Sequence, residues 1–128
     1  MGFDKVKIVC KSWGLKAQPE INHCRLVPAE ADLIIDCRGI KEHGLDRNNQ
    51  LLFQEQIRLN NPGTIQSMVE LIMDSFAQIP ARRSEKEDPY SNPYIVVFVC
   101  AHGMHRSKNT KHVVAFRLRE LGYSVTVE

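Results

Sequence analysis

The chain has 128 residues, the usual size of one globular domain and too short for two cores of ordinary size. Hydrophobic residues make up 43% and charged residues 25%, a composition that excludes a disordered chain, a collagen-like repeat and a coiled coil. The formal charge is only +2, so the total charge gives no reason to expect a nucleic-acid or membrane binder. Basic residues exceed acidic ones after residue 99, and an anion-binding face is expected towards that part of the chain.

The cysteines indicate a reducing compartment. Cys10, Cys24, Cys37 and Cys100 are widely and irregularly spaced, and no apolar signal segment precedes them. A disulfide framework is therefore not expected, and the simplest location is the cytoplasm. The longest apolar stretch, residues 95–101, is far shorter than the roughly 20 residues needed to cross a bilayer, so no membrane partner is expected.

Three strands are predicted before the last part of the chain. Residues 5–10 alternate charged with apolar side chains, which is typical of a strand with one buried face. Residues 32–36 and 94–100 are short apolar runs rich in β-branched side chains, typical of strands buried on both faces in a parallel sheet. Between the predicted strands, residues 15–30 and 81–93 carry prolines and little periodicity, and they read as loops.

Two helices and a final strand complete the prediction. Thr64 is a suitable N-cap for a helix that Pro80 ends. A second helix begins near Ser107 and stops at Gly122, with an apolar side expected at Val113, Val114, Arg117, Leu118 and Leu121. Residues 123–127 then alternate apolar with polar side chains, which predicts a final strand. Strands separated by helices predict a single three-layer α/β domain over residues 1–128, with a mainly parallel sheet.

The most informative segment runs from the strand ending at Cys100, through a tight loop, to the helix that begins near Ser107. Backbone N–H groups at a helix N-terminus lack intrahelical partners and converge where the helix dipole favours negative charge. Gly103 permits a tight turn, and Arg106 offers a planar fork for two phosphate oxygens. The candidate ligand residues in this segment are Cys100, His102, Gly103, His105, Arg106 and Ser107.

The same spacing, Cys-x5-Arg-Ser, matches the phosphate loop of cysteine-dependent phosphatases. In such an enzyme, Cys100 would be the nucleophile and Arg106 the phosphate clamp, because a positive loop lowers the pKa of a cysteine. A general acid must then protonate the leaving oxygen, and none of Asp36, Asp46 and Asp88 stands out for that role. A third reading makes Cys100 the end of a core strand and Arg106 a surface charge, in an interaction module without an anion site.

Three motifs give the chain a resemblance to the C-terminal domain of the RNase adapter protein family RapZ. Ser12-Trp13-Gly14-Leu15-Lys16 resembles the family's Ser-Phe-Gly-Phe-Lys motif, and residues 31–38 resemble its Ala-Asp-Tyr-Val-Phe-Asp-Val-Arg strand. Residues 100–107 are similar to its Gly-Cys-Thr-Gly-Gly-x-His-Arg-Ser loop. The resemblance implies a phosphofructokinase-subdomain-like α/β fold, a phosphosugar ligand, and RNA and protein partners. It also implies that Ser12, Lys16 and Arg38 are neighbouring ligands of the phosphate loop.

Several residues depart from the family pattern. Ala101 and His102 replace Thr and Gly in the loop, about a dozen residues are inserted between Lys16 and Ala31, and no Gly-x4-Gly-Lys-Ser/Thr motif occurs. Nucleotide hydrolysis is therefore not transferred, and neither a cofactor nor a metal is expected. The expected partner is a phosphorylated small molecule or another anion.

Lys16 and Arg38 also follow predicted strands, and ligands of open α/β sheets bind outside the carboxyl ends of the strands. The alternative is that these residues are ordinary surface cations. Four cations of the last predicted helix could contact RNA phosphates or simply form a solvated face: Lys108, Lys111, Arg117 and Arg119.

Overall fold

The structure, a computed structural model, describes residues 6–15, 30–41, 49–79, 92–101 and 106–128. Within these ranges the strands are β1 (Ile8–Gly14), β2 (Leu33–Asp36), β3 (Tyr94–Cys100) and β4 (Val125–Val127), and the helices are α1 (Gln50–Asn60), α2 (Pro62–Ala77) and α4 (Arg106–Glu120). The strands form one sheet in the order β2-β3-β1-β4, and each neighbouring pair is parallel. The predicted α/β domain with a mainly parallel sheet is confirmed.

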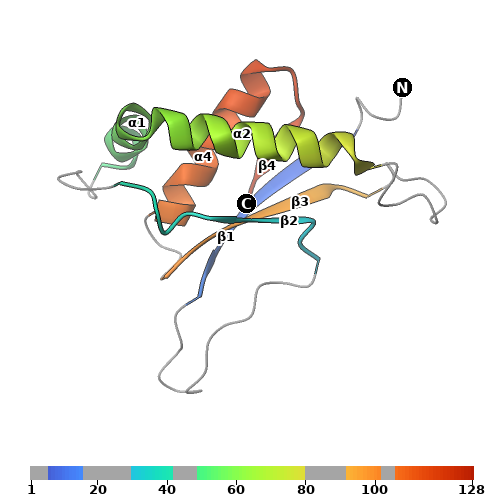
Figure 1. Cartoon of the computed structure of the whole chain (residues 1–128), viewed down its shortest axis with the longest axis horizontal. Helices are drawn as coiled ribbons and strands as arrows, with labels where there is room; N and C mark the ends of the chain where they lie inside the picture. The colour runs from blue at the N-terminus through green and yellow to red at the C-terminus, as the bar shows by residue number, and fades with distance from the viewer. Residues whose placement is uncertain (1–5, 16–29, 42–48, 80–91, 102–105) are drawn as a thin grey trace.

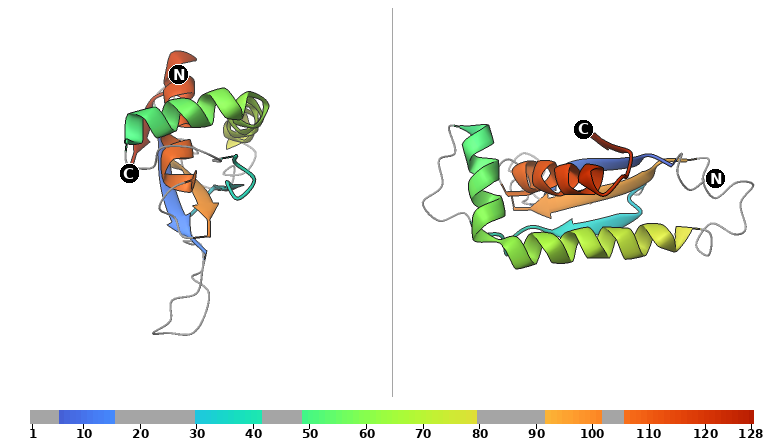
Figure 2. Two further views of the ribbon diagram at one scale, coloured as in Figure 1. Left: turned by 90° about the vertical axis from the view of Figure 1, so that its left-hand side faces the viewer. Right: turned by 90° about the horizontal axis from the view of Figure 1, so that it is seen from above.

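The described helices lie on the same side of the sheet (Figure 1). Helix α4 packs over β1, β3 and β4, and α2 contacts β2. Seen from above, α2 runs along one margin of the sheet and α4 lies beside it over the central strands (Figure 2). The described residues therefore supply the sheet and one helical layer of the expected three-layer arrangement.

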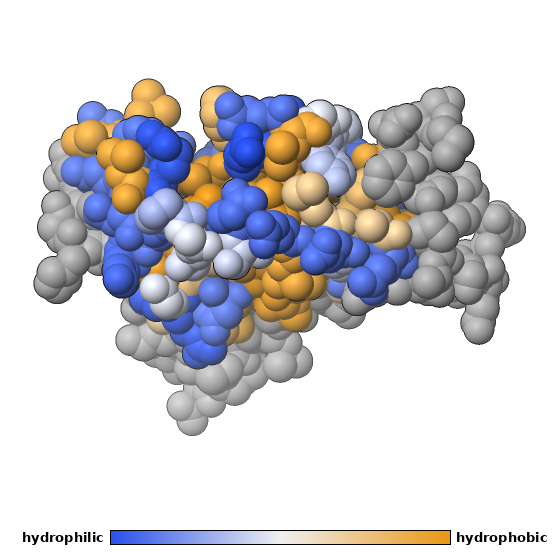
Figure 3. All heavy atoms as spheres, turned by 45° about the horizontal axis from the view of Figure 1, so that its top comes forward, coloured by the Kyte–Doolittle hydropathy of each residue, from blue (hydrophilic) through white to orange (hydrophobic). Residues whose placement is uncertain are grey.

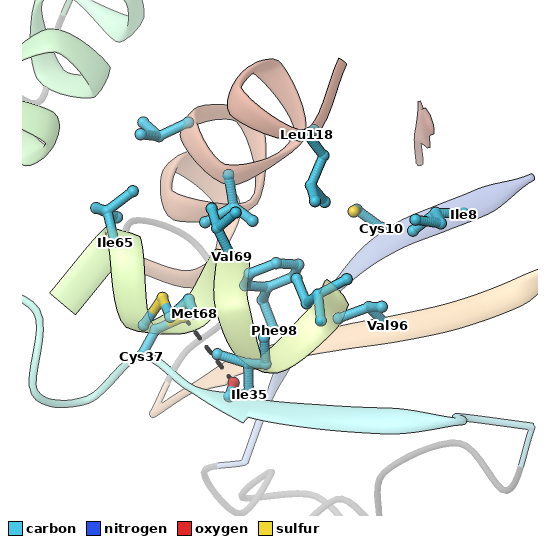
Figure 4. Packing of buried hydrophobic residues seen from close by; sticks show 14 of the residues in the cluster. Ile8, Cys10, Ile35, Cys37, Ile65, Met68, Val69, Val96, Phe98 and Leu118 are labelled. Atoms are coloured by element: carbon cyan, nitrogen blue, oxygen red, sulfur yellow. Dashed lines mark hydrogen bonds between the residues drawn. The ribbon is translucent and has the colours of Figure 1, made fainter. Parts of the chain in front are cut away.

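The core lies between this helical layer and the sheet. Side chains that alternate along the strands, such as Ile8 and Cys10 of β1 and Val96 and Phe98 of β3, join one buried cluster with residues of α2 and α4. Figure 4 shows Phe98 and Ile35 below α2, with Leu118 of α4 above Cys10. The central strand β3 is paired on both edges, and its apolar sequence is what that position requires. The same burial on both faces was expected for β2 and is wrong: β2 is an edge strand of the described sheet, and Ile34 is 50% exposed.

Strand β1 is longer than predicted. It does not end at Cys10 but continues through Ser12 and Trp13 to Gly14, because β3 pairs with it along its whole length, from Ile8 opposite Tyr94 to Gly14 opposite Cys100. The first motif therefore lies largely within a strand rather than directly after one. This extension carries Ser12 into the sheet, two residues before its carboxyl edge.

Helix α2 confirms that the first predicted helix exists, whereas α1 was not predicted. The predicted N-cap, Thr64, is wrong: α2 begins two residues earlier, because Pro62 suits the first turn of a helix and Asn61 takes the N-cap position. The two helices meet at Asn61, which is buried. Its side chain accepts a hydrogen bond from the Lys41 N–H at 2.8 Å and donates to the Lys41 and Ile57 carbonyl oxygens, both at 3.0 Å. Asn61 thereby ties the segment that follows β2 to the helical layer.

The helical side of the surface mixes hydrophobic and hydrophilic residues, as Figure 3 shows. Single large apolar side chains are exposed there, among them Leu51 and Leu59 of α1 and Phe116 of α4. None of the helices in the described ranges has the length and apolar character needed to cross a membrane.

Candidate anion site at the carboxyl edge of the sheet

Three neighbouring strands end together beside the first turn of α4. The Leu15 N–H, directly after β1, donates to the Cys100 carbonyl oxygen at 2.9 Å, and the Cys37 N–H, directly after β2, donates to the Val99 carbonyl oxygen at 2.7 Å. The ends of β1, β2 and β3 are thus held side by side. We call this the carboxyl edge of the sheet, and it is the edge at which open α/β sheets bind their ligands.

Arg106 reaches from the start of α4 across to the end of β2. Its Nη1 donates to the Arg38 carbonyl oxygen at 2.6 Å, although the two residues are far apart in the sequence. Arg106 is partly exposed, and its first-turn position adds the helix dipole to its own charge. The structure thus places the predicted clamp residue at the edge where the three strands end.

The Arg38 side chain is bound to its neighbour Asp36. The Arg38 Nε and Nη2 donate to the two carboxylate oxygens at 2.7–3.1 Å, and the backbone N–H of Arg38 adds a further bond at 2.9 Å. These bonds lower the pKa of Asp36, so this exposed carboxylate is ionised at neutral pH. Asp36 is therefore poorly suited to serve as a general acid.

Cys100 at the end of β3 and Ser107 in the first turn of α4 form a buried pair. The Cys100 Sγ donates to the Ser107 Oγ at 3.1 Å, and both residues are almost completely buried. A serine hydroxyl at this position can instead donate to the sulfur if the cysteine becomes a thiolate. The first turn of α4 is thus fixed to the end of β3 by side chains of two candidate ligand residues.

Lys111 is a further cation at this edge, one turn after Ser107 on α4. It is only 5% exposed, and its Nζ donates to the Ser12 Oγ at 3.0 Å and to the Glu128 carbonyl oxygen at 2.5 Å. Burial, more than the neighbouring charge of Lys108, lowers the pKa of this amine. Arg106 therefore contacts the β2 side of the edge, while Lys111 contacts the β1 and β4 side.

The structure changes the predicted faces of α4. Arg117 and Leu121 are exposed, while Ser107, Thr110 and Lys111 are buried against the sheet. Of the four cations considered for RNA, Lys111 thus lies on the buried face, Arg117 pairs with Glu120, and Arg119 donates to the Val125 carbonyl oxygen. The basic residues of α4 do not share one exposed stripe.

Other predicted ligand residues lie outside the described ranges: Lys16, His102, Gly103 and His105. Asp46 and Asp88 also lie outside them. Within the described ranges, no three His, Cys, Asp or Glu side chains gather as a metal site would require.

We expect Lys111→Met to raise the melting temperature at pH 7. The folded-state pKa of Lys111 is lowered, so the charged amine weakens the native state at neutral pH. That destabilisation is relieved as pH rises from the folded pKa towards about 10.5. The difference in melting temperature between the variant and the wild type should therefore shrink as the pH rises. Thermal unfolding of both proteins between pH 7 and 10 measures this difference.

Lys108→Met provides the control, because Lys108 is exposed one turn earlier on the same helix. We expect it to change the melting temperature by little at any of these pH values. A Lys111→Met protein that melts below the wild type at pH 7 would show that the bonds to Ser12 and Glu128 outweigh the burial of the charge.

Comparison with known proteins gives no family for this chain. No protein-family model matches it, and a search of the curated proteins found no match. The resemblance to the C-terminal domain of RapZ therefore stays a prediction, which depends on the three motifs and on the place where their described residues meet.

Proposed function

We propose that the chain is a binding module for a phosphorylated small molecule of the phosphosugar type. The phosphate would be held at the carboxyl edge by the segment from Cys100 to Ser107, with Arg106 as its principal charged ligand. One observation carries the proposal: the first two turns of α4 hold buried polar side chains, and two of these residues bond to Cys100, at the end of β3, and to Ser12, near the end of β1.

Burial of polar groups favours a specific role for this end of α4. Ser107, Thr110 and Lys111 occupy helix positions that apolar side chains would fill at lower free-energy cost. Farther along the same buried face of α4, Val114 and Leu118 are apolar residues of the kind that usually fill a core. Polar residues thus replace apolar ones only where the helix approaches the carboxyl edge.

The charges at this edge favour an anion. Arg106 and Lys111 are cations fixed by hydrogen bonds on opposite sides of the first turns of α4. The ionised Asp36 is already neutralised by Arg38, and the α4 dipole adds partial positive charge. A phosphate dianion provides acceptor oxygens for both the guanidinium fork and the helix N–H groups.

Titration with inorganic phosphate tests the proposal. We expect amide NMR signals of Arg106, Ser107 and Cys100 to shift in a saturable way, whereas sodium chloride at the same ionic strength leaves them in place. A hexose 6-phosphate should bind more tightly than inorganic phosphate, and the unphosphorylated hexose should not bind. Shifts scattered over the surface, or equal shifts with chloride, would contradict a phosphate site at this edge.

The contact between Cys100 and Ser107 favours one second candidate, a cysteine-dependent phosphatase. The Cys100 thiolate would attack phosphorus and expel the alkoxide, and water would then release inorganic phosphate from the sulfur. The Ser107 hydroxyl could stabilise the thiolate that leaves in the second step. Against this candidate, a phosphate monoester, which is much larger than a peroxide, would have to reach a cysteine that is only 3% exposed, and Asp36 is held ionised.

Hydrolysis of an aryl phosphate separates the two candidates. A phosphatase should release the phenol, and Cys100→Ser should abolish this release while retaining phosphate binding. A binding module should give no release above that of Cys100→Ser, although both proteins bind inorganic phosphate.

A further inference from the structure

Two buried thiols lie at the carboxyl edge, Cys100 at the end of β3 and Cys37 directly after the neighbouring strand β2. The pairing of β2 with β3 places Asp36 opposite Val99. The Cys37 N–H continues this ladder with its bond to the Val99 carbonyl oxygen at 2.7 Å. In a parallel ladder, that bond sets the next residue of β3, Cys100, opposite Cys37.

The expected Cα separation of the two cysteines is compatible with a disulfide. Neighbouring strands lie about 4.8 Å apart, within the range of about 4.4 to 6.8 Å between the Cα atoms of disulfide-bonded cysteines. The two side chains also point to the same face, since both belong to the cluster under the helices. Figure 4 shows Cys37 on this face, beneath α2 and close to Ile35.

The electrostatics of Cys37 agree with this placement. Burial is the main reason that the pKa of its thiol is raised to about 12, and the nearby Cys100 raises it further, while Arg106 opposes the shift. Cys37 is therefore a thiol in the resting protein, within electrostatic reach of both Cys100 and Arg106. Cys37 is completely buried whereas Cys100 is 3% exposed beside the first turn of α4, so Cys100 is the better candidate for the first attack on a molecule as small as a peroxide.

We propose that Cys37 and Cys100 form a reversible disulfide when the protein meets a peroxide. The Cys100 sulfur attacks the peroxide, which leaves a sulfenic acid on Cys100 and releases water. The Cys37 sulfur then attacks the Cys100 sulfur and displaces its hydroxyl, which leaves as water with the Cys37 proton. Two thiols and one hydrogen peroxide thus give one disulfide and two waters, and a dithiol reductant reverses the change.

The disulfide switches off anion binding, a consequence that rests on the proposed function. Bonded to Cys37, the Cys100 sulfur can no longer donate to Ser107, and the first turn of α4 loses its link to β3. The bridge also ties the end of β3 to the residue before Arg38, whose carbonyl oxygen holds Arg106. Oxidation therefore removes one contact that positions the phosphate ligands and constrains the backbone next to a second one.

Peroxide treatment of the folded protein tests the disulfide without any ligand. We expect the intact mass to fall by two hydrogen atoms, non-reducing peptide mapping to join Cys37 to Cys100, and dithiothreitol to restore the original mass. Cys10→Ala is the matched control, because Cys10 is a buried thiol of the same cluster whose pKa is also raised to about 12. It should form the bridge like the wild type, whereas Cys37→Ala should not.

Peptide mapping of the wild type decides the proposal even if Cys37→Ala folds poorly. A folded protein that gives no peptide joining Cys37 to Cys100, or that joins either residue to Cys24 instead, overturns it. Inorganic phosphate titration before and after oxidation tests the switch. If the reduced protein binds no phosphate, the proposed function is wrong, and the disulfide is still judged by the peptide mapping. If fully oxidised protein binds phosphate as well as reduced protein does, the switch is wrong and the proposed function stands.

Discussion

Arg106→Ala is expected to weaken inorganic phosphate binding by about ten- to a hundredfold. The substitution removes a charge-assisted interaction worth about 1.5–3 kcal/mol, and about 1.4 kcal/mol corresponds to a factor of ten. Arg106 is also fixed at the β2 end of the carboxyl edge by its hydrogen bond to the Arg38 carbonyl oxygen. Isothermal titration calorimetry with phosphate, at constant ionic strength, measures the loss directly.

Two further variants make this result specific. Arg117→Ala removes an exposed guanidinium from the other end of α4, where it pairs with Glu120, and should leave phosphate affinity within twofold (about 0.4 kcal/mol) of the wild type. Arg106→Lys keeps the charge but loses the planar fork, so its affinity should lie between those of the alanine variant and the wild type. Equal losses for Arg106→Ala and Arg117→Ala would indicate a general effect of net charge instead of a site.

The second large effect concerns stability: Phe98→Ala should lower the free energy of unfolding by about 3–5 kcal/mol. Phe98 is fully buried in the central strand, within the cluster between the sheet and the helices. Its ring is lost together with the contacts around it, and the cavity cannot close without moving strands that are paired on both sides. Because domains are stable by only about 5–15 kcal/mol, urea unfolding should show a much lower midpoint.

Phe116→Ala is the matched control, because it removes the same side chain from a position that is 61% exposed on α4. We expect its free energy of unfolding to stay within about 0.5 kcal/mol of the wild type. A loss at Phe116 as large as that at Phe98 would mean that the Phe116 ring packs against something in solution, such as a partner chain.

The strands and two of the helices could be predicted because their signals are local. Period-two alternation, short β-branched runs and the stripe from Ile65 to Phe76 each require only a few neighbouring residues. Helix α1 has no such stripe: only Phe53 and Ile57 are buried, while Leu51 and Leu59 are exposed. Its position depends on packing against α4 and on the bonds of Asn61 to Lys41, which sequence alone does not provide.

The candidate site was predicted in part. The strand-to-helix geometry pointed to Cys100, Arg106 and Ser107, and the structure brings these residues to one edge with Ser12 and Arg38. Lys111 was overlooked as a member of this edge, because a lysine on a helix is usually solvated. One signal was available: Ser107, Lys111, Val114 and Leu118 follow one another at four- and three-residue steps, which places the lysine on the apolar face.

The order of the strands also has a consequence for how the chain folds. Strand β1 is the first of the described strands in the sequence, yet its neighbours in the sheet are β3 and β4, which come last. Pairing over such separations closes long loops before it gains contacts, and folding is slow when native contacts are this distant. During synthesis, β1 therefore leaves the ribosome before either of the strands that pair with it, β3 and β4, has been made.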